Sequence, residues 1–345
     1  MFNTRFYESA EKKRREYMKK KSLNVLSALC LSATVLAGCS SNEETKPLKI
    51  GVAQIVSHTS LNTIRDSFVS QMEELGYKDG ETVEYDFADA AGQPSNLNAI
   101  MSQFADEESD AIVAIATPTA QAAANYAEEI PVVFSAVSDP VGAGLVQSLD
   151  KPGGNITGTS DEVQIDQIIA LAKQVNPDLK TLGFLYNAGE ANSVSNLKKA
   201  KEYCSANGIE LIEGTGKDMT ELQSSASVLA EKVDAMFSPN DNTVASGMAA
   251  LSKIALDAKI PYYVGADSMV QDGGFATVGI NYEELGRETA NMVDEILKGE
   301  KAGDIPVKVF KDGLNIYVNK AYMDQLNITL PDEIKDDDNL IMIGE

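Results

Sequence analysis

The sequence predicts an α/β fold built from two similar halves, each with a parallel β-sheet. Short apolar runs of strand length alternate with longer segments that have apolar residues at helical spacing, which is typical of parallel sheets with helical crossovers. One passage occurs twice, because residues 111–121 and 233–242 both run from an apolar strand through a hydroxyl residue and a proline into a polar helix start. A Pro-led strand and an aspartate, Asp139 or Asp267, follow each passage.

The expected elements of the first half are four strands, each followed by a helix or a loop. Apolar runs mark the strands, and Gly76 ends the first helix. The strands are expected at residues 49–56, 82–87, 111–116 and 132–135, and the helices at residues 61–75, 96–104 and 119–127. A turn-rich segment at residues 151–161 adds a short strand and a candidate hinge.

The second half restarts the same alternation. Its helices are expected at residues 164–175, 194–207, 219–230 and 241–257, and its strands at residues 181–186, 209–213, 233–237, 261–265 and 273–281. An amphipathic helix at residues 282–297 is expected to return to the first half, and residues 315–319 are expected to form a further crossing strand. Residues 331–345 are expected to be an acidic tail.

Composition limits the function. The 345 residues are 43% hydrophobic and 23% charged, which suits a globular chain of two typical domains. A net charge of −23 argues against nucleic-acid binding, which needs a positive surface. His58 is the only histidine, so no histidine pair is available for a metal site or a catalytic dyad, and neither a dinucleotide motif nor a P-loop is present. We therefore expect no cofactor and no metal.

The first 38 residues have the pattern of a targeting segment. A basic stretch at residues 12–21 precedes a short apolar run at residues 23–36 and then Leu36-Ala-Gly-Cys39. This resembles a bacterial lipoprotein signal, in which cleavage before Cys39 leaves that cysteine as the lipid-bearing N-terminus. A retained membrane anchor is the alternative, but the apolar run is shorter than the roughly 20 residues of a transmembrane helix. Translation could also begin at Met18 instead of Met1.

The lipoprotein interpretation places the mature protein on the extracytoplasmic face of the cell membrane. Removal of eight basic and three acidic residues changes the net charge from −23 to −28. Residues 39–47 are expected to be a tether between lipid and fold. Cys30 is removed and Cys39 carries the lipid, so Cys204 alone remains and no internal disulfide can form. We expect Cys204 to be a partly buried helix residue.

Several motifs in fixed order resemble the substrate-binding lipoproteins of ABC importers in the tryptophan/tyrosine-type family. The resemblance extends from about residue 49 to residue 326. Besides the lipobox, its motifs are Gln54-Ile-Val-x-His58-x-x-Leu61, Ala116-Thr-Pro-Thr-Ala, Ser138-Asp-Pro-Val-Gly-Ala-Gly-Leu-Val, Gly153-Gly-Asn-Ile-Thr-Gly-Thr-Ser-Asp, Asn240-Asp-Asn-Thr and Thr277-Val-Gly-Ile-Asn-Tyr-x-x-Leu-Gly.

The resemblance implies a type I periplasmic-binding-protein fold, with two Rossmann-like lobes joined by a three-crossing hinge. The first lobe would comprise residues 48–158 and 281–308, and the second residues 159–280 and 309–330. The implied ligand is an amino acid, with tryptophan, tyrosine or phenylalanine favoured, and the implied partner is an ABC permease. The protein would capture the ligand by hinge closure and would catalyse no reaction.

The ligand carboxylate needs hydrogen-bond donors, which we place at the end of the third strand. In open α/β sheets, ligands bind beyond the carboxyl ends of the strands. The candidates are a hydroxyl in the loop after the first strand and polar or backbone groups of the following helix start: Ser57, Thr117, Thr119, Ala120 and Gln121. Thr117 could equally serve only as a helix cap.

The ligand ammonium needs a carboxylate, because an unpaired buried charge is costly. Asp139, Asp241 and Asp267 all follow strand ends, and we favour Asp241 and Asp267 because they lie in the second half. Each also has an ordinary structural interpretation, since Asp241 and Asp267 could cap helices and Asp139-Pro is a common turn opener.

The remaining candidates are His58, Tyr186, Asn240 and Tyr282. His58 lies in a motif beside the expected cleft, although a lone loop histidine is often a surface residue. The tyrosines could stack on an aromatic ligand, because the chain has no tryptophan. Core packing is the alternative for both of them.

Three other functions stay open at this point. The same fold could bind another solute, such as a nucleoside, a branched-chain amino acid or a sugar. An extracytoplasmic enzyme is disfavoured, because the sequence has no G-x-S-x-G elbow and no metal-ligand cluster. A sensor accessory protein would need a partner to carry its signal across the membrane.

Overall fold

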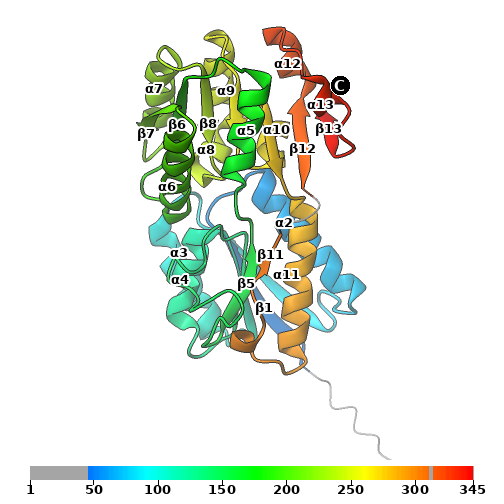
Figure 1. Ribbon diagram of the computed structural model, residues 1–345. Helices are drawn as coiled ribbons and strands as arrows, with labels where there is room; N and C mark the ends of the chain where they lie inside the picture. Colours follow the sequence, from blue (N-terminus) through cyan, green and yellow to red (C-terminus); the bar gives the residue numbers. More distant parts are fainter. Residues whose placement is uncertain (1–45, 311–313, 345) are drawn as a thin grey trace, which may run out of the picture. The chain divides into compact units, whose positions relative to one another are not determined.

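Two β-sheets organise the chain, in a computed structural model that describes residues 46–310 and 314–344 (Figure 1). The predicted signal peptide, Cys39 and most of the predicted tether lie outside the described residues. Each sheet with its helices is called a lobe below. Mixed strands and helices in two mostly parallel sheets confirm the predicted α/β fold class.

The first sheet has six parallel strands in the order β11-β5-β4-β3-β1-β2. They are β1 (Leu48–Gln54), β2 (Val83–Asp89), β3 (Ala111–Ile115), β4 (Val132–Ser135), β5 (Ile156–Ser160) and β11 (Lys308–Val309). The helices of this lobe are α2 (Thr59–Glu74), α3 (Pro94–Asp106), α4 (Thr117–Ala123), η1 (Ala124–Tyr126), α11 (Tyr282–Leu297) and η2 (Ala302–Asp304).

The second sheet has seven strands in the order β13-β12-β10-β9-β8-β6-β7, and only the pairing of β10 with β12 is antiparallel. Its strands are β6 (Thr181–Tyr186), β7 (Glu210–Thr215), β8 (Ala235–Ser238), β9 (Tyr262–Val264), β10 (Ala276–Gly279), β12 (Asn315–Asn319) and β13 (Leu340–Ile343). Its helices are α5 (Ile165–Val175), α6 (Ala191–Ala206), α7 (Met219–Ala230), α8 (Asn242–Ser246), α9 (Met248–Asp257), α10 (Asp267–Gln271), α12 (Lys320–Leu326) and α13 (Asp332–Lys335).

Burial on both faces explains the uninterrupted apolar run of β3. Ile112 and Ala114 join one hydrophobic cluster, and Val113 and Ile115 join the other. Successive side chains of a strand point to opposite faces, so a central parallel strand needs apolar residues throughout. The Val and Ile content of the run also favours a strand.

The chain passes between the sheets three times, after β5, β10 and β11. The second passage leads into α11, which returns to the first lobe as predicted and packs on α2, β4 and β5. Hydrogen bonds between the Thr289 hydroxyl and those of Ser135 (2.7 Å) and Thr159 (3.1 Å) fix α11 against the first sheet. The lobe boundaries expected from the sequence stay a prediction, and β5 extends two residues past the expected boundary at residue 158.

Two sequence predictions need correction. The expected acidic tail at residues 331–345 contains helix α13 and strand β13, because the apolar run Leu340–Ile343 pairs with β12 and extends the second sheet. The single helix expected at residues 241–257 is two helices, α8 and α9, which are separated at Gly247. The Met219 side chain packs against the backbone of Gly247 at this break.

Cys204 lies in α6, as expected, but it is fully buried. Burial raises the pKa of its thiol to about 11, so the thiol is protonated at neutral pH. Cys204 is therefore a packing residue of the second lobe.

Candidate functional site

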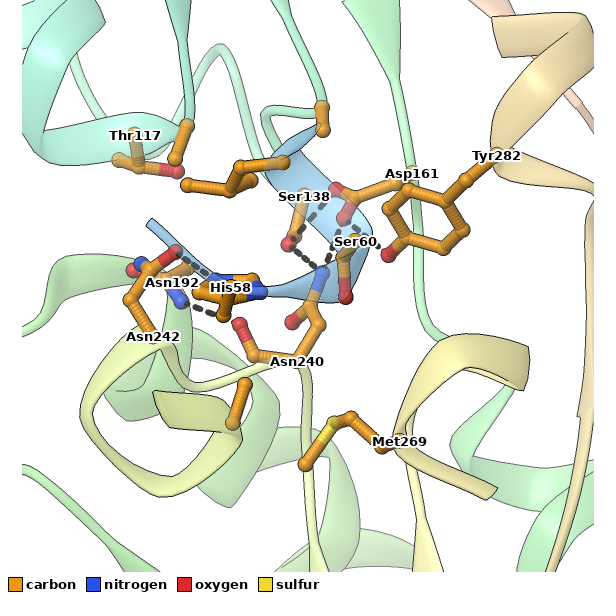
Figure 2. Close-up of a pocket in the computed structure, with 14 residues that line it drawn as sticks. His58, Ser60, Thr117, Ser138, Asp161, Asn192, Asn240, Asn242, Met269 and Tyr282 are labelled. Carbon is orange, nitrogen blue, oxygen red and sulfur yellow. Dashed lines mark hydrogen bonds between the residues drawn. The ribbon is translucent and has the colours of Figure 1, made fainter. Parts of the chain in front are cut away.

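A cavity lies between the two lobes, and the empty space among its lining atoms, open solvent included, is about 330 Å³. It is lined from the first lobe by residues that follow β1, β3, β4 and β5 and by the first residue of α11, and from the second by residues of α6, α8, α10 and the loop after β8. The lining residues are His58, Ser60, Leu61, Ala116, Thr117, Ala136, Ser138, Asp161, Asn192, Asn240, Asn242, Ala245, Met269 and Tyr282 (Figure 2). The position at the carboxyl ends of strands is the one that α/β sheets offer to ligands.

Asp161, at the end of β5, is the central carboxylate of this cavity. It accepts hydrogen bonds from the Tyr282 hydroxyl (2.8 Å), the Ser138 hydroxyl (3.0 Å) and the Asn240 amide (Figure 2). Burial raises the pKa of Asp161 to about 6, although these three hydrogen bonds act to lower it. The carboxylate is thus ionised at neutral pH and lies in a site from which most water is excluded.

Asn240 connects the second lobe to this carboxylate, and Tyr282 holds the carboxylate from the first lobe. The Asn240 amide also donates to the Ser138 hydroxyl at 2.8 Å. Burial, followed by the charge of Asp161, raises the pKa of Tyr282 far above its ordinary value, so its hydroxyl remains a donor. The network therefore holds Asp161 in one orientation with the second lobe in contact.

Three polar atoms in the cavity wall are buried and have no hydrogen-bond partner among the described residues. They are Nδ1 of His58, Oγ1 of Thr117 and Oδ1 of Asn192. Unpartnered buried polar atoms are rare in folded proteins because each costs free energy. Their gathering in one cavity indicates a place for a ligand with hydrogen-bonding groups.

Two alanines of the cavity wall have unusual backbone angles. Ala116, between β3 and α4, has φ of 75°, and Ala136, after β4, has φ of 57°. Residues other than glycine seldom adopt positive φ, and such strain is concentrated at functional sites. Both bends lie in the cavity wall, at the carboxyl edge of the first sheet.

Direct hydrogen bonds between the lobes surround the cavity. On the side of α2 and α10, the Thr59 hydroxyl donates to Asp272 at 2.9 Å, and the hydroxyls of Ser60 and Ser268 are 2.5 Å apart. Elsewhere along the interface, the Ser195 hydroxyl donates to Asp139 at 2.7 Å. These contacts hold the lobes together over the cavity.

Four of the twelve ligand-binding candidates predicted from the sequence line the cavity. They are His58, Thr117, Asn240 and Tyr282. Thr117 does not act as a cap, because α4 begins without a side-chain cap and the Thr117 hydroxyl is unpaired. The structure brings these four residues together from both lobes.

The other eight candidates lie outside the cavity wall. Ser57 is exposed and bonds to Asn62, Gln121 is exposed and donates to the Ala143 carbonyl, and Thr119 and Ala120 are buried. The other four make hydrogen bonds elsewhere in the fold. Asp139 accepts a hydrogen bond from Ser195, and Tyr186 donates one to Glu213. Asp241 caps α8, and Asp267 accepts a hydrogen bond from the backbone N–H of Ser268.

Sequence reasoning missed the polar residues Ser60, Ser138, Asp161, Asn192 and Asn242, and the apolar Met269. Ser138 and Asp161 could have been predicted from the sequence, because both lie in recognisable motifs shortly after the strands β4 and β5. No local signal marks Asn192, because its side chain reaches the cavity only through the packing of α6.

Neither a metal-ligand group nor a membrane span is found among the described residues. No group of three or more histidine, cysteine, aspartate or glutamate side chains is arranged there to hold a metal ion. Among the same residues, no helix has both the length and the apolar character that crossing a bilayer requires.

Comparison with known proteins identifies the family. The family model described as "ABC transporter substrate binding protein" matches residues 49–339. The "Tyrosine-binding protein" of Clostridioides difficile (strain R20291) is 37% identical over 321 residues, which cover 90% of this chain and 93% of that protein. Both matches extend over nearly all of the described residues.

Two solved structures are similar to the chain in different degrees. An ABC domain from Streptococcus pneumonia in complex with L-Trp has a TM-score of 0.82 at 38% identity, covering 86% of this chain and 100% of that one. The ligand-free, open structure of a substrate binding protein with adhesive properties from Clostridium difficile has a TM-score of 0.66 at 40% identity, covering 86% and 99%. From the matched family model and the 37% identical relative, the chain belongs to the family of ABC transporter substrate-binding proteins.

Proposed function

We propose that the protein binds an L-amino acid with an aromatic side chain between its lobes and delivers it to an ABC permease, without catalysing a reaction. The observation that carries this proposal is the cavity that joins the ionised carboxylate of Asp161 to three unpartnered polar atoms. A free amino acid carries both an ammonium group and hydrogen-bonding groups that such a cavity can bind.

Asp161 is the proposed partner of the ligand ammonium. A carboxylate offers about four acceptor positions, and Asp161 uses three of them for Tyr282, Ser138 and Asn240. A charged hydrogen bond in a buried site is stronger than one in water. This assignment replaces Asp241 and Asp267, our favoured candidates from the sequence, neither of which lines the cavity.

Apolar surfaces complete the wall of the cavity and support an aromatic side chain. Leu61, Ala245, Met269 and the ring of Tyr282 contribute them. A thioether makes favourable contacts with aromatic rings, and a tyrosine ring can stack on one. The complex of a similar protein with L-Trp agrees with this choice of ligand class.

Closure of the lobes is the proposed capture step. The two solved structures have nearly equal sequence identity to this chain, but the TM-score is higher for the L-Trp complex (0.82) than for the ligand-free, open structure (0.66). The hydrogen bonds across the interface are those of a closed form, because they need the lobes in contact. A ligand that bridges the lobes would shift the population toward this form.

The chain contains no tryptophan, which permits a direct test. In a titration of the purified protein with L-tryptophan, all indole fluorescence comes from the ligand. Calorimetry would then compare tryptophan, tyrosine and phenylalanine with leucine, isoleucine, valine, a nucleoside and a sugar. We expect saturable binding of aromatic amino acids. Binding of another solute class, with no detectable binding of any of the three aromatic amino acids, would contradict the proposal.

We further propose that Cys39 carries a lipid that holds the protein on the extracytoplasmic face of the membrane. Support comes from the basic and apolar stretches before Leu36-Ala-Gly-Cys39. Cys39→Ser is expected to release the protein from the membrane fraction and to abolish labelling by a fatty-acid analogue. Membrane retention with no label in the unaltered chain would contradict lipid anchoring.

A further inference from the structure

Glu190 is a buried carboxylate behind the ligand cavity that does not line it. It is 7% exposed and precedes α6. Its Oε2 accepts from the backbone N–H (3.0 Å) and the side-chain amide (2.6 Å) of Asn242, and its Oε1 accepts from the backbone N–H (3.1 Å) and hydroxyl (2.9 Å) of Thr243. The side-chain amide of Asn192 donates to the same Oε2 at 3.4 Å. Glu190 therefore accepts hydrogen bonds from Asn192 and Asn242, two residues of the cavity wall, without lining the cavity itself.

These contacts fix which way both asparagine side chains point. A carboxylate only accepts hydrogen bonds, so the amide nitrogen of Asn242 must face Glu190 and its Oδ1 must face away. That oxygen lies 3.5 Å from Nε2 of His58. The amide nitrogen of Asn192 donates to Glu190 and to the Asn240 carbonyl (3.1 Å), which leaves its Oδ1 at the cavity without a partner among the described residues.

The orientation of Asn242 determines the tautomer of His58. An amide oxygen can only accept, so Nε2 of His58 must carry the proton in this contact. In the neutral ring, Nδ1 then holds a lone pair and acts as an acceptor. Burial lowers the pKa of His58, against the opposing effects of Asn242, Asp272 and Asp89, so the ring is neutral at pH 7.

We propose that Glu190 is a positioning residue that fixes two acceptors, His58 Nδ1 and Asn192 Oδ1, for an N–H or O–H donor on the ligand side chain. The proposal rests on the proposed function, in which Asp161 binds the ligand ammonium. Figure 2 shows His58 and Asn192 on the opposite side of the cavity from Asp161 and Tyr282. A ligand whose ammonium lies at Asp161 therefore presents its side chain to the two acceptors.

This arrangement selects among aromatic amino acids. The indole N–H of tryptophan and the phenol O–H of tyrosine can donate to His58 or Asn192, whereas phenylalanine has no side-chain donor. A site built to accept a hydrogen bond rejects a ligand that leaves its buried polar groups unpaired. Phenylalanine is therefore expected to bind at least about tenfold more weakly than tyrosine and tryptophan.

The single histidine makes the tautomer directly measurable. In ¹⁵N NMR of the untagged full chain, all imidazole signals come from His58. We expect the Nε2–H tautomer in the unaltered protein. Glu190→Gln replaces one acceptor oxygen by an amide donor, which would face the donor groups of Asn242 or Thr243. Part of the Asn242 side chains are then expected to turn over and point their amide nitrogen at His58, which favours the Nδ1–H tautomer of the imidazole. Glu231→Gln, the same change at an exposed position of the same lobe, is the control and should change nothing.

Two NMR results would overturn the positioning role. One is a dominant Nδ1–H tautomer in the unaltered protein, and the other is an identical tautomer in folded Glu190→Gln. Should Glu190→Gln fail to fold, the tautomer of His58 and the ligand affinities of the unaltered protein still test the acceptor pair, because these measurements need no variant.

The ligand titrations separate this inference from the proposed function. Tyrosine and tryptophan are expected to shift the Nδ1 resonance of His58, and Glu190→Gln is expected to weaken both about tenfold and to narrow their advantage over phenylalanine. Phenylalanine affinity equal to that of tyrosine and tryptophan would refute the acceptor pair while leaving the proposed function standing. No detectable binding of tyrosine, tryptophan or phenylalanine would refute the proposed function itself, whatever the tautomer of His58.

Discussion

At the scale of single residues, the charge of Asp161 dominates the cavity. Its carboxylate is buried at the end of β5 and keeps its charge at neutral pH through hydrogen bonds from Tyr282, Asn240 and Ser138. Burial opposes the charge and raises the pKa to about 6. The free protein therefore gains a proton at Asp161 just below neutral pH.

Ligand affinity is expected to fall as the pH decreases through 6. Below its pKa of about 6, Asp161 must lose a proton before it can bind an ammonium, so the affinity decreases by up to about tenfold per pH unit. Asp161→Asn is expected to weaken binding about tenfold to a hundredfold at pH 7.5 and to remove this pH dependence. Calorimetry between pH 5 and 7.5 would measure both effects.

Asp166→Asn provides the control for this prediction. Asp166 lies five residues further along the chain, in the first turn of α5, and its side chain is exposed. The control should keep both the affinity and its pH dependence. An Asp161→Asn variant with the same pH profile as the unaltered protein would show that another group controls binding.

At the scale of secondary-structure elements, the contact between α2 and α11 shows how close packing builds the first lobe. Gly286 of α11 faces α2, and a Cβ there would lie 2.3 Å from Oγ of Ser67 and 2.5 Å from the carbonyl oxygen of Ile64. The two backbones can approach this closely because residue 286 has no side chain. The N-terminal residue of the same helix, Tyr282, is thereby held at the cavity.

Gly286→Ala is expected to destabilise the protein by about 1–3 kcal/mol, because the added methyl group must push α11 away from the backbone of α2. Ligand binding should weaken as well, since Tyr282 moves with α11. Chemical denaturation and calorimetry would measure the two changes. Glu284→Ala, an exposed substitution on the same helix, should change the free energy of unfolding by no more than about 0.5 kcal/mol. Equal stability of the two variants would contradict the packing argument.

At the scale of the whole molecule, buried carboxyl groups link stability to pH. Burial raises the pKa of Asp161 and of Asp267 to about 6. The pKa of Asp241 is also raised, first by burial and then by the charge of Glu190. Unfolding exposes all three to water, where each ionises near pH 4. The folded state therefore binds more protons than the unfolded state in the neutral range.

Thermal stability of the ligand-free protein is expected to fall as the pH rises from 6.5 to 8, mainly through Asp241, whose folded-state pKa is raised to about 8, because Asp161 and Asp267 lose their contribution as the pH rises to about 6. A raised pKa in the folded state contributes stability that is complete at low pH and is lost as the pH passes that pKa, by up to about 1.4 kcal/mol per unit and group. His58, whose pKa is lowered, has the opposite effect only below pH 6.5. Thermal unfolding across this range would measure the slope.

Asp241→Asn tests the main source of that slope, because Asp241 is fully buried. The variant is expected to be less stable at pH 6.5, since Asp241 accepts from Ser193 and caps α8, but its stability should vary less with pH. Asp178→Asn, at an exposed position, should keep the slope of the unaltered protein. A steep slope in Asp241→Asn would mean that this carboxyl is already ionised in the folded state.

The sequence by itself determined the α/β fold, the order of most elements and the edge of the sheets at which the cavity lies. Local patterns carry this information, because an apolar run such as Val132–Ser135 or a helical spacing such as that of α11 depends on near neighbours. The repeat around Thr117 and Asn240 correctly placed two residues of the cavity wall.

Only the tertiary structure decided which polar side chains meet. Asp241 and Asp161 both follow strand ends, yet one caps α8 in the interior of the second lobe and the other enters the cavity. Asn192 and Glu190 acquire their roles from the packing of α6 against residues about 50 positions away. The physical reason is that burial, hydrogen-bond partners and side-chain orientation depend on contacts between distant segments, which no local pattern records.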